Sequence, residues 1–358
     1  MPSLKEIKGR INSISSTLAI TSAMKMVAAA KLQKAQMAIQ NMLPYERRLH
    51  SMLIDLMGAM NISAAASEDG SVRGSGSAER GFDQSGDRLS LSNRHDLAGM
   101  DGAYSLMAQR EVRKVAIVAF ASNSSLCGAF NSNVIREATA VINEYRASGL
   151  GDADITVYSV GRKMAEAMKK LGFPSPADFT KMSDSPSYEA ASALAQELLD
   201  GFVSGRFDKV ELVYNHYKST SSQPTIRQTY LPLSLADATA DIQVGKITDS
   251  ASESDTNRVA EPVGAPVVRQ GSPTTEDLIV EPSKEELIAT LLPKVVRLRV
   301  FTTLLDSTAA EQAARTVAMQ LATDNGNDLL QELTLEYNKG RQQKITSEIL
   351  DLVGGSLQ

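Results

Sequence analysis

Large aromatic side chains are scarce in this chain of 358 residues. It contains no Trp, and Phe, Trp and Tyr together make up only 5% of it. The hydrophobic core must therefore consist of Ala, Leu, Ile, Val and the 14 Met residues, which pack well between helices. This composition favours an architecture dominated by helix–helix packing.

Residues with redox or metal-binding chemistry are also few. Cys127 is the only cysteine, which excludes an internal disulfide and fits a reducing compartment. His50, His95 and His216 are the only histidines and lie far apart, and no H-E-x-x-H or C-x-x-C motif is present. The formal net charge of −5 offers no overall basic excess for nucleic acid. We therefore expect no metal site, no cofactor and no nucleic-acid partner.

Motifs for nucleotide binding and catalysis are missing as well. Gly245 and Lys246 lack the earlier glycine and the hydroxyl residue of a phosphate-binding loop. The turn at residues 123–128 (NSSLCG) is the nearest approach to a nucleophile site, because it follows a predicted strand and contains two serines and a cysteine. Small residues also allow a tight strand-to-helix turn, and we favour this structural interpretation. We expect no catalytic residue.

No long hydrophobic run or targeting segment is found. The longest continuous apolar run covers residues 115–121, whereas a membrane-spanning helix needs about 20 residues. Neither a signal peptide nor a transit peptide is indicated before the first helical pattern. We expect no direct membrane span, so that any link to a membrane goes through another protein.

What the chain does have is a long heptad pattern at its N-terminus. Ser3 and Glu6 form a capping box, which predicts that a helix begins there. Apolar residues then recur in alternating steps of three and four, the period of a left-handed supercoil. They are Leu4, Ile7, Ile11, Ile14, Leu18, Ala28, Leu32, Ala35, Ile39, Met42, Leu49, Leu53 and Leu56. We assign residues 1–61 to this helix and predict a kink or local break at residues 41–44, where Pro44 lies.

Thr21, Lys25 and Glu46 interrupt this pattern. Lys25 either sets the register of the helix pair or contacts a partner, and we favour the structural explanation. Near it the apolar stripe is expected to shift toward Ala23 and Val27. Residues 1–43 carry a net charge of +5 and residues 240–283 a net charge of −5. The basic helix is either a solvated face or a surface for an acidic partner.

The C-terminal segment also begins with a capping box that is followed by a long helical pattern. Ser283 and Glu286 form a second capping box after Pro282, and a helical pattern continues to the glycines at 354 and 355. Pro293 is expected to bend this helix. At 1.5 Å per residue the two terminal helices are about 80 Å and about 100 Å long. We expect them to pack antiparallel on one another, with residues 346–358 projecting as an apolar tip that needs a socket on a partner.

The middle of the chain alternates between strand and helix patterns. Strands are predicted at residues 115–121, 155–160, 209–215 and 225–231, with a further short one at 177–181. Helices are predicted at residues 131–147, 162–171 and 185–203. This alternation predicts a central α/β domain (residues 112–235) with a mostly parallel sheet whose last two strands are antiparallel neighbours. Residues 62–111, with a possible helix at 97–107, and the acidic residues 236–283 are assigned as insertions, and residues 284–358 as the C-terminal coiled-coil helix.

Several motifs in the terminal helices resemble one family. Residues 23–32 (AMKMVAAAKL) resemble the first helix of the gamma subunit of F-type ATP synthases. Residues 313–319 (AARTVAM), 322–325 (ATDN) and 333–339 (LTLEYNK) resemble its last helix, and residues 122–131 (SNSSLCGAFN) resemble its central strand–turn motif. The resemblance implies a central-stalk rotor that couples ion-driven ring rotation to ATP synthesis or hydrolysis and is not itself an enzyme. The family usually has Asp-Arg-Gly where this chain has Asn123, Ser124 and Ser125.

The resemblance also implies partners and contact residues. Its members assemble with alpha and beta subunits of a catalytic head, with an epsilon subunit and with a membrane c-ring. Met24 and Lys25 correspond to the contact with an acidic loop of a beta subunit. The opposing contacts correspond to Arg341, Gln342, Thr346 and Glu348. The implied location is peripheral, on the cytoplasmic face of a bacterial inner membrane.

Two other functions remain open from the residues alone. One is a helical tether or scaffold with an α/β binding domain. The other is an α/β hydrolase or nucleotide enzyme with coiled-coil arms. Co-purification with alpha and beta subunits separates a rotor from a tether, and ATPase turnover by the purified chain would favour an enzyme.

Overall fold

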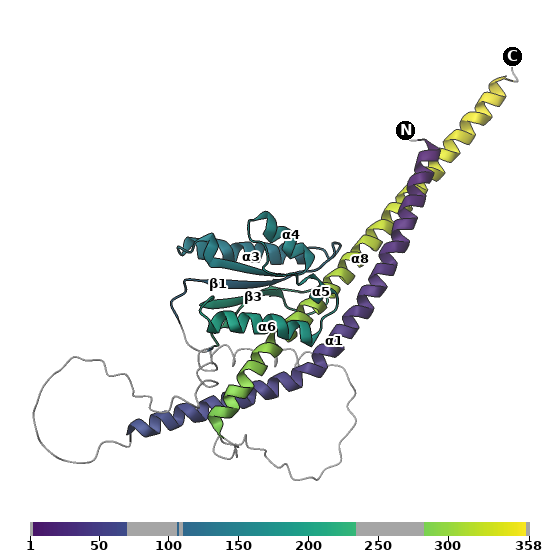
Figure 1. Ribbon diagram of the computed structural model, residues 1–358. Helices are drawn as coiled ribbons and strands as arrows, with labels where there is room; N and C mark the ends of the chain where they lie inside the picture. The colour runs from purple at the N-terminus through teal and green to yellow at the C-terminus, as the bar shows by residue number, and fades with distance from the viewer. Residues whose placement is uncertain (1–2, 70–105, 107–109, 234–282, 356–358) are drawn as a thin grey trace, which may run out of the picture.

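Two long helices and a small α/β domain make up the computed structural model, which describes residues 3–69, 106, 110–233 and 283–355. Helices α1 (Leu4–Asp69) and α8 (Lys284–Gly355) run antiparallel and form what we call the helix pair. The middle domain, residues 110–233, lies against one side of it (Figure 1). The predicted fold class is confirmed. The structure leaves most of the proposed insertions 62–111 and 236–283, including nearly all of the possible helix at 97–107, outside the described residues.

Both terminal helices begin at the predicted capping boxes. The backbone N–H of Glu6 donates to Ser3 Oγ at 3.2 Å, and that of Glu286 donates to Ser283 Oγ at 3.1 Å. Pro44 lies inside α1 without ending it, so the predicted local break is absent, although the helix changes direction in its lower half (Figure 1). A single proline removes only one intrahelical hydrogen bond, and the flanking seam residues are packed. The helix also continues through residues 62–69, past the predicted end.

The predicted heptad seam is the buried edge of α1. Leu32 and Ala35 pack against Ala309 and Ala313 of α8 in a small cluster of their own. Alanine on both helices allows the two backbones to approach closely. The seam therefore faces the other terminal helix, as the length argument required.

Polar interruptions of the seam have partners across the pair. Thr323 Oγ1 donates to Thr21 Oγ1 at 3.0 Å, and Thr302 Oγ1 donates to Glu46 Oε1 at 3.0 Å. Lys25 is half-buried at its seam position, whereas Ala23 is exposed. The predicted shift of the stripe toward Ala23 and Val27 is therefore wrong. The Thr21–Thr323 contact, one helical turn before Lys25, holds the two helices in the register of the heptad pattern.

The middle domain contains a four-stranded sheet in the order β2-β1-β3-β4. Strands β1 (Val115–Phe120), β2 (Ile155–Val160) and β3 (Lys209–Asn215) are parallel, and β4 (Thr225–Leu231) is antiparallel to β3. All six residues of β1 are buried, as expected for a central strand covered on both faces. These four strands were predicted with bounds that differ by at most one residue.

Helices cover both faces of the sheet. Helices α3 (Phe130–Ala147) and α4 (Arg162–Lys170) pack on one face, and α6 (Tyr188–Val203) packs on the other, between the sheet and α8 (Figure 1). The predicted strand at residues 177–181 is wrong. Part of it belongs to the short helix α5 (Thr180–Asp184). The Asp178 carboxylate accepts the backbone N–H of Thr180 at 2.9 Å, an Asx turn that competes locally with an extended strand.

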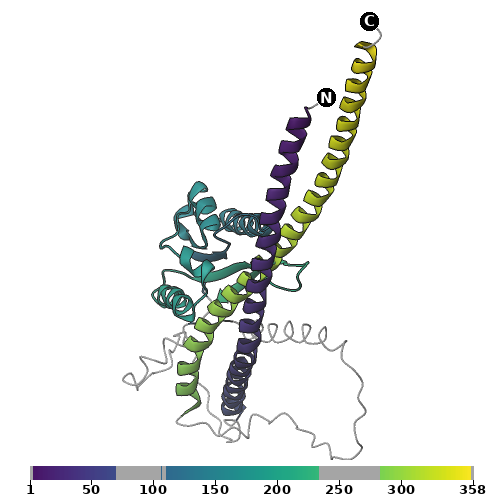
Figure 2. The same cartoon turned by 90° about the vertical axis from the view of Figure 1, so that its right-hand side faces the viewer.

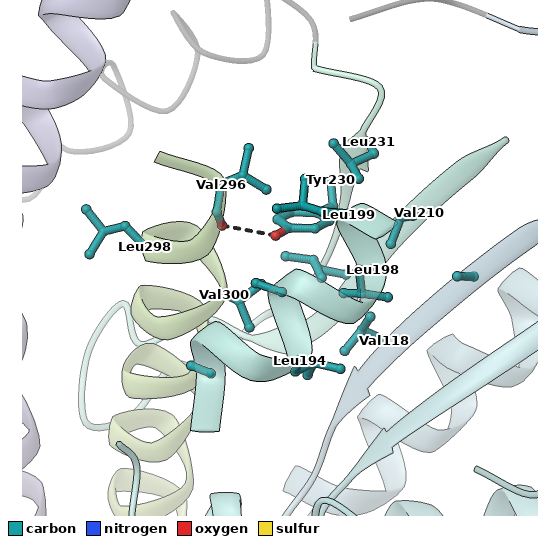
Figure 3. Packing of buried hydrophobic residues seen from close by; sticks show 14 of the residues in the cluster. Val118, Leu194, Leu198, Leu199, Val210, Tyr230, Leu231, Val296, Leu298 and Val300 are labelled. Carbon is teal, nitrogen blue, oxygen red and sulfur yellow. Dashed lines mark hydrogen bonds between the residues drawn. The ribbon is translucent and has the colours of Figure 1, made fainter. Parts of the chain in front are cut away.

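One apolar cluster joins the sheet, α6 and α8 into a common core. Figure 3 shows Leu194 and Leu198 of α6 beside Val118 of β1, with Val300 of α8 nearby. The buried Tyr230 of β4 donates its hydroxyl to the carbonyl of Val296 at 3.0 Å. The lower part of α8 is therefore both half of the helix pair and a wall of the middle domain.

Candidate functional site

The helix pair exposes large apolar side chains that the seam does not cover. On α1 these include Ile20, Met26 and Val27, each more than half exposed, and on α8 they include Leu321 and Leu335. Large apolar surface of this kind on a soluble protein commonly marks contact with other proteins. The helix pair is therefore a candidate interaction surface along most of its length.

Two of the predicted contact residues lie in the middle of this surface. Met24 is 40% exposed, while Lys25 is half-buried beside the seam. The Thr21–Thr323 hydrogen bond places this part of α1 opposite Met319 and Gln320 of α8. Met24 thus points outward at a height where both helices are present.

The other four predicted contact residues lie on α8 alone. Gly340 faces the side chain of Leu4, at the start of α1, so α8 projects as a single helix from about Arg341 onward (Figure 2). Arg341, Gln342, Thr346 and Glu348 are all exposed on this tip. Thr346 Oγ1 donates to the Gln342 carbonyl at 2.9 Å within the helix. The projecting tip begins about one turn earlier than residue 346, where the sequence placed it.

The structure does not bring the two groups of contact residues together. About 21 residues of α8 separate the height of Met24 from Arg341, which corresponds to about 30 Å along the helix. Ile345, Ile349, Leu350 and Leu352 add an apolar surface to the tip, and Leu352 is 75% exposed. The predicted site is therefore two separate surfaces, one in the middle of the helix pair and one at its tip.

A third functional region joins the middle domain to the helix pair at the end of β1. Arg315 of α8 donates to the carbonyl of Ser125 at 2.7 Å and to Ser124 Oγ at 2.8 Å. It also pairs with Glu311 at 2.6 Å. Burial raises the pKa of Glu311, and the Arg315 guanidinium opposes this effect. The turn that resembled a nucleophile site is thus an attachment point on α8.

The same turn keeps its cysteine away from solvent. Cys127 is buried, and Asn131 Nδ2 lies 3.1 Å from its sulfur. Phe130 and Cys127 pack against Ala310 of α8. Leu126 takes a positive φ of 69°, which is rare for a non-glycine residue and reflects the tightness of the turn. The geometry agrees with the structural interpretation of this turn.

A second attachment lies at the end of β3. The hairpin between β3 and β4 reaches the helix pair (Figure 2), and Asp306 of α8 accepts from two of its residues. His216 Nδ1 lies 2.6 Å from one carboxylate oxygen, and the backbone N–H of Tyr217 donates to the other at 2.9 Å. Gln36 of α1 donates to the Tyr217 hydroxyl at 2.7 Å. The hydrogen bond to Asp306 raises the pKa of His216, although burial opposes the change.

Sequence reasoning missed these attachment residues. Asp306 and Arg315 are single charged residues within a long helical pattern, which is equally typical of a solvated face. A signal did exist, because Asp306 directly follows the mostly apolar run at residues 295–305. A charge next to a buried stripe calls for a buried partner.

Neither metal-binding nor membrane-spanning features are found in the described ranges. Among residues 3–69, 106, 110–233 and 283–355, no three Asp, Glu, His or Cys side chains gather in a way that could hold a metal ion. No helix within these ranges combines the length and apolar character needed to cross a bilayer.

Comparison with known proteins identifies the family. A family model described as ATP synthase matches residues 3–357. The ATP synthase gamma chain of Phocaeicola vulgatus is 47% identical over 357 residues and is covered, like this chain, at 100%. The chain belongs to the ATP synthase gamma chain family. The gamma chain of Bacteroides thetaiotaomicron is 45% identical, again with 100% of both chains covered.

Membership of the gamma chain family agrees with the architecture. A chain in the cryo-EM structure of the Euglena gracilis mitochondrial ATP synthase (OSCP/F1/c-ring, rotational state 3) has a TM-score of 0.52 and 18% identity. The match covers 98% of this chain and 92% of that chain, and it concerns the fold. The expected role as a central-stalk subunit of an ATP synthase is confirmed, and nothing favours the helical tether.

Proposed function

We propose that this chain is a rotor that carries rotation from a membrane c-ring to the catalytic head without catalysing a reaction itself. The helix pair extends into the head formed by alpha and beta subunits, and the middle domain, together with an epsilon subunit, lies on the ring. The main support is the apolar tip of α8, which projects past α1 with Ile349, Leu350 and Leu352 uncovered. Such a surface needs a socket on neighbouring subunits.

Rotation acts through shape rather than through chemistry of this chain. The middle domain lies on one side of the helix pair, and α8 extends past the start of α1 (Figure 1). A shaft of this asymmetric shape meets each surrounding subunit differently as it turns. It therefore favours a different conformation, and a different nucleotide affinity, in each subunit in turn.

The proposed contacts follow the two exposed surfaces. Met24 and Lys25 contact an acidic loop of a beta subunit, which the basic excess of residues 1–43 favours electrostatically. Arg341, Gln342, Thr346 and Glu348 contact the head near the tip. The rotor works at the cytoplasmic face of a bacterial inner membrane as a peripheral subunit.

The tip contact is tested by the double substitution Arg341→Ala with Gln342→Ala. Both side chains are exposed, so folding and assembly are expected to persist while ATP-driven proton pumping per ATP hydrolysed decreases. Arg136→Ala, an exposed arginine of α3 in the middle domain, is the matched control and should leave the ratio unchanged. An unaltered ratio in the double variant removes these two residues from the site.

The rotor itself is tested by mild extraction of membranes that contain a tagged chain. Alpha, beta and epsilon subunits and the c-ring are expected to co-purify with it, and the isolated chain is expected to hydrolyse no ATP. Recovery without the head subunits would contradict the proposal, and turnover by the isolated chain would favour an enzyme.

A further inference from the structure

The hairpin between β3 and β4 is the place where three parts of the molecule meet. Its residue Tyr217 packs against Leu32 and Ala35 of α1 together with Ala309 of α8. The same ring also packs against the Cys127 cluster at the end of β1. Movement of the middle domain relative to the helix pair must therefore displace this side chain.

Polar contacts hold the hairpin in this position. One oxygen of the Asp306 carboxylate contacts His216 Nδ1, and the other accepts the backbone N–H of Tyr217. Gln36 of α1 donates to the Tyr217 hydroxyl. The backbone N–H of His216 donates to the Pro224 carbonyl at 2.9 Å, which connects it to the β4 side of the hairpin. We call Gln36, His216, Tyr217 and Asp306 the clasp.

We propose that the clasp adds to the stiffness with which the shared core and Arg315 hold the middle domain on the helix pair, and that protonation of His216 increases this contribution. The proposal rests on the rotor function proposed above, because stiffness matters only where torque passes between these two parts. Asp306 and His216 are positioning residues here and touch no substrate.

The chemical reason lies in the contact between His216 and Asp306. A neutral imidazole with its proton on Nδ1 donates one hydrogen bond to the carboxylate but carries no net charge. The imidazolium keeps this hydrogen bond and adds a full positive charge beside the negative carboxylate, so Coulombic attraction strengthens the contact. The side chains of His216 and Asp306 are only 23% and 19% exposed, so solvent screens this difference incompletely.

Charged neighbours determine when His216 changes state. Asp306 of α8 raises the pKa of His216, while Lys218 of the same hairpin lowers it and burial opposes protonation. From α1 the neighbouring polar group is Gln36, which is uncharged. The net direction is upward, so the stronger contact is present at low pH and is lost as the pH rises through the raised pKa.

The test measures angular fluctuations in the assembled complex. The head is fixed to a surface, and a rod is attached to the middle domain through Lys169→Cys, an exposed position of α4, while Cys127 stays buried. Without ATP, the angular variance of the rod reports how stiffly the middle domain is held. We expect the variance to rise from about pH 5.5 to about pH 9 when His216 is native.

Three variants separate protonation from simple loss of structure. His216→Gln should show the high variance at every pH, whereas His216→Lys, which stays charged over this range, should show the low variance throughout. Asp306→Asn keeps an acceptor for Tyr217 but should lose the pH dependence. Asp152→Asn, which breaks an exposed ion pair with Arg146 away from the shaft, should behave like the native chain.

The outcomes also distinguish this inference from the rotor proposal. If the rod does not rotate when ATP is added, the rotor proposal fails. If it rotates but its variance is independent of pH with His216 native, or if His216→Gln keeps the native pH dependence, the clasp proposal alone is overturned.

Discussion

At the scale of single residues, removing one member of a buried charge cluster is costly, because the other charges then lose their partner. The Glu211 side chain on β3 is only 2% exposed. It accepts from Arg227 of β4 at 2.7 Å, from Lys209 at 2.7 Å and from Tyr145 of α3 at 2.6 Å. Burial alone would raise the pKa of Glu211, but these donors together outweigh it and the pKa is lowered. The carboxylate thus ties the edge strand β4 to β3 and to α3.

Replacing this carboxylate is predicted to destabilise the middle domain. Glu211→Gln keeps the shape but leaves Arg227 and Lys209 without their shared counter-charge, with an expected loss on the order of 3 kcal/mol. Because the folded pKa is lowered, the native contribution is present above the ordinary carboxyl pKa and is lost as the pH falls through the folded one. Thermal unfolding followed by circular dichroism at neutral and acid pH measures both effects. A variant as stable as the native chain at neutral pH would contradict this account.

The turn after β2 requires a glycine for two reasons, a positive backbone φ angle and a neighbouring carbonyl oxygen that leaves no room for a Cβ. Gly161 has a φ of 95°, and a Cβ placed there would lie 2.0 Å from the carbonyl oxygen of Ala121. Gly161→Ala is expected to destabilise the domain by on the order of 2 kcal/mol or more, measured by thermal unfolding. Gly172→Ala is the matched control, since its φ of 91° is similar but no atom lies within 4 Å of the added Cβ. Equal losses in the two variants would show that the close approach is unimportant.

At the scale of elements, periodicity and caps were enough to predict most of the secondary structure. The two terminal helices, the four strands and the antiparallel β3–β4 pair were predicted, because long repeats and capping boxes are local signals. Two errors had local causes that only the structure displays. Asp178 forms an Asx turn just before α5 where a strand was predicted, and the Thr21–Thr323 contact holds the register near Lys25.

Two glycines of α8 lie where side chains of α1 approach its backbone closely. A Cβ at Gly326 would lie 2.7 Å from the Leu18 side chain in the middle of the seam, and one at Gly340 would lie 3.1 Å from Leu4 at its end. Alanine is favoured over glycine inside a helix by about 1 kcal/mol. Since Leu4 lies at the start of α1 and can shift easily, Gly340→Ala should slow hydrogen exchange of the surrounding amides. Gly326→Ala should slow hydrogen exchange less, because the Leu18 side chain lies closer to the added Cβ and must shift within the seam. Slower exchange in Gly326→Ala than in Gly340→Ala would contradict this packing.

The candidate site was predictable only in part, and for different reasons along the chain. The exposed tip followed from the unequal lengths of the two helices, and Arg341 and Gln342 were chosen from a family resemblance. Arg315 and Tyr217 were not predictable, and for Asp306 the sequence indicates only a charge beside an apolar run, because the partners depend on which loops of the middle domain reach α8. Such contacts between distant segments leave no periodic trace in a sequence.

At the scale of the whole molecule, the tip and the body are separable. The part of α8 beyond Gly340 has passed the start of α1, so its removal leaves the seam and the middle-domain core in place. Deletion of residues 344–358 is therefore predicted to preserve the unfolding transition of the remainder while reducing proton pumping per ATP hydrolysed in the assembled complex. Loss of the unfolding transition would show that the tip supports the fold, and unchanged pumping would show that the head does not use it.

The offset between α1 and α8, by which α8 continues past the start of α1, also makes bending non-uniform along the axis. Two rods joined along a packed seam resist bending far more than one rod, because their material lies farther from the neutral line. The molecule is thus rigid from the middle domain up to Leu4 and compliant above it. In the proposed rotor, the last turns of α8 can yield to small offsets of a surrounding socket, so the axis need not be perfectly centred to keep turning.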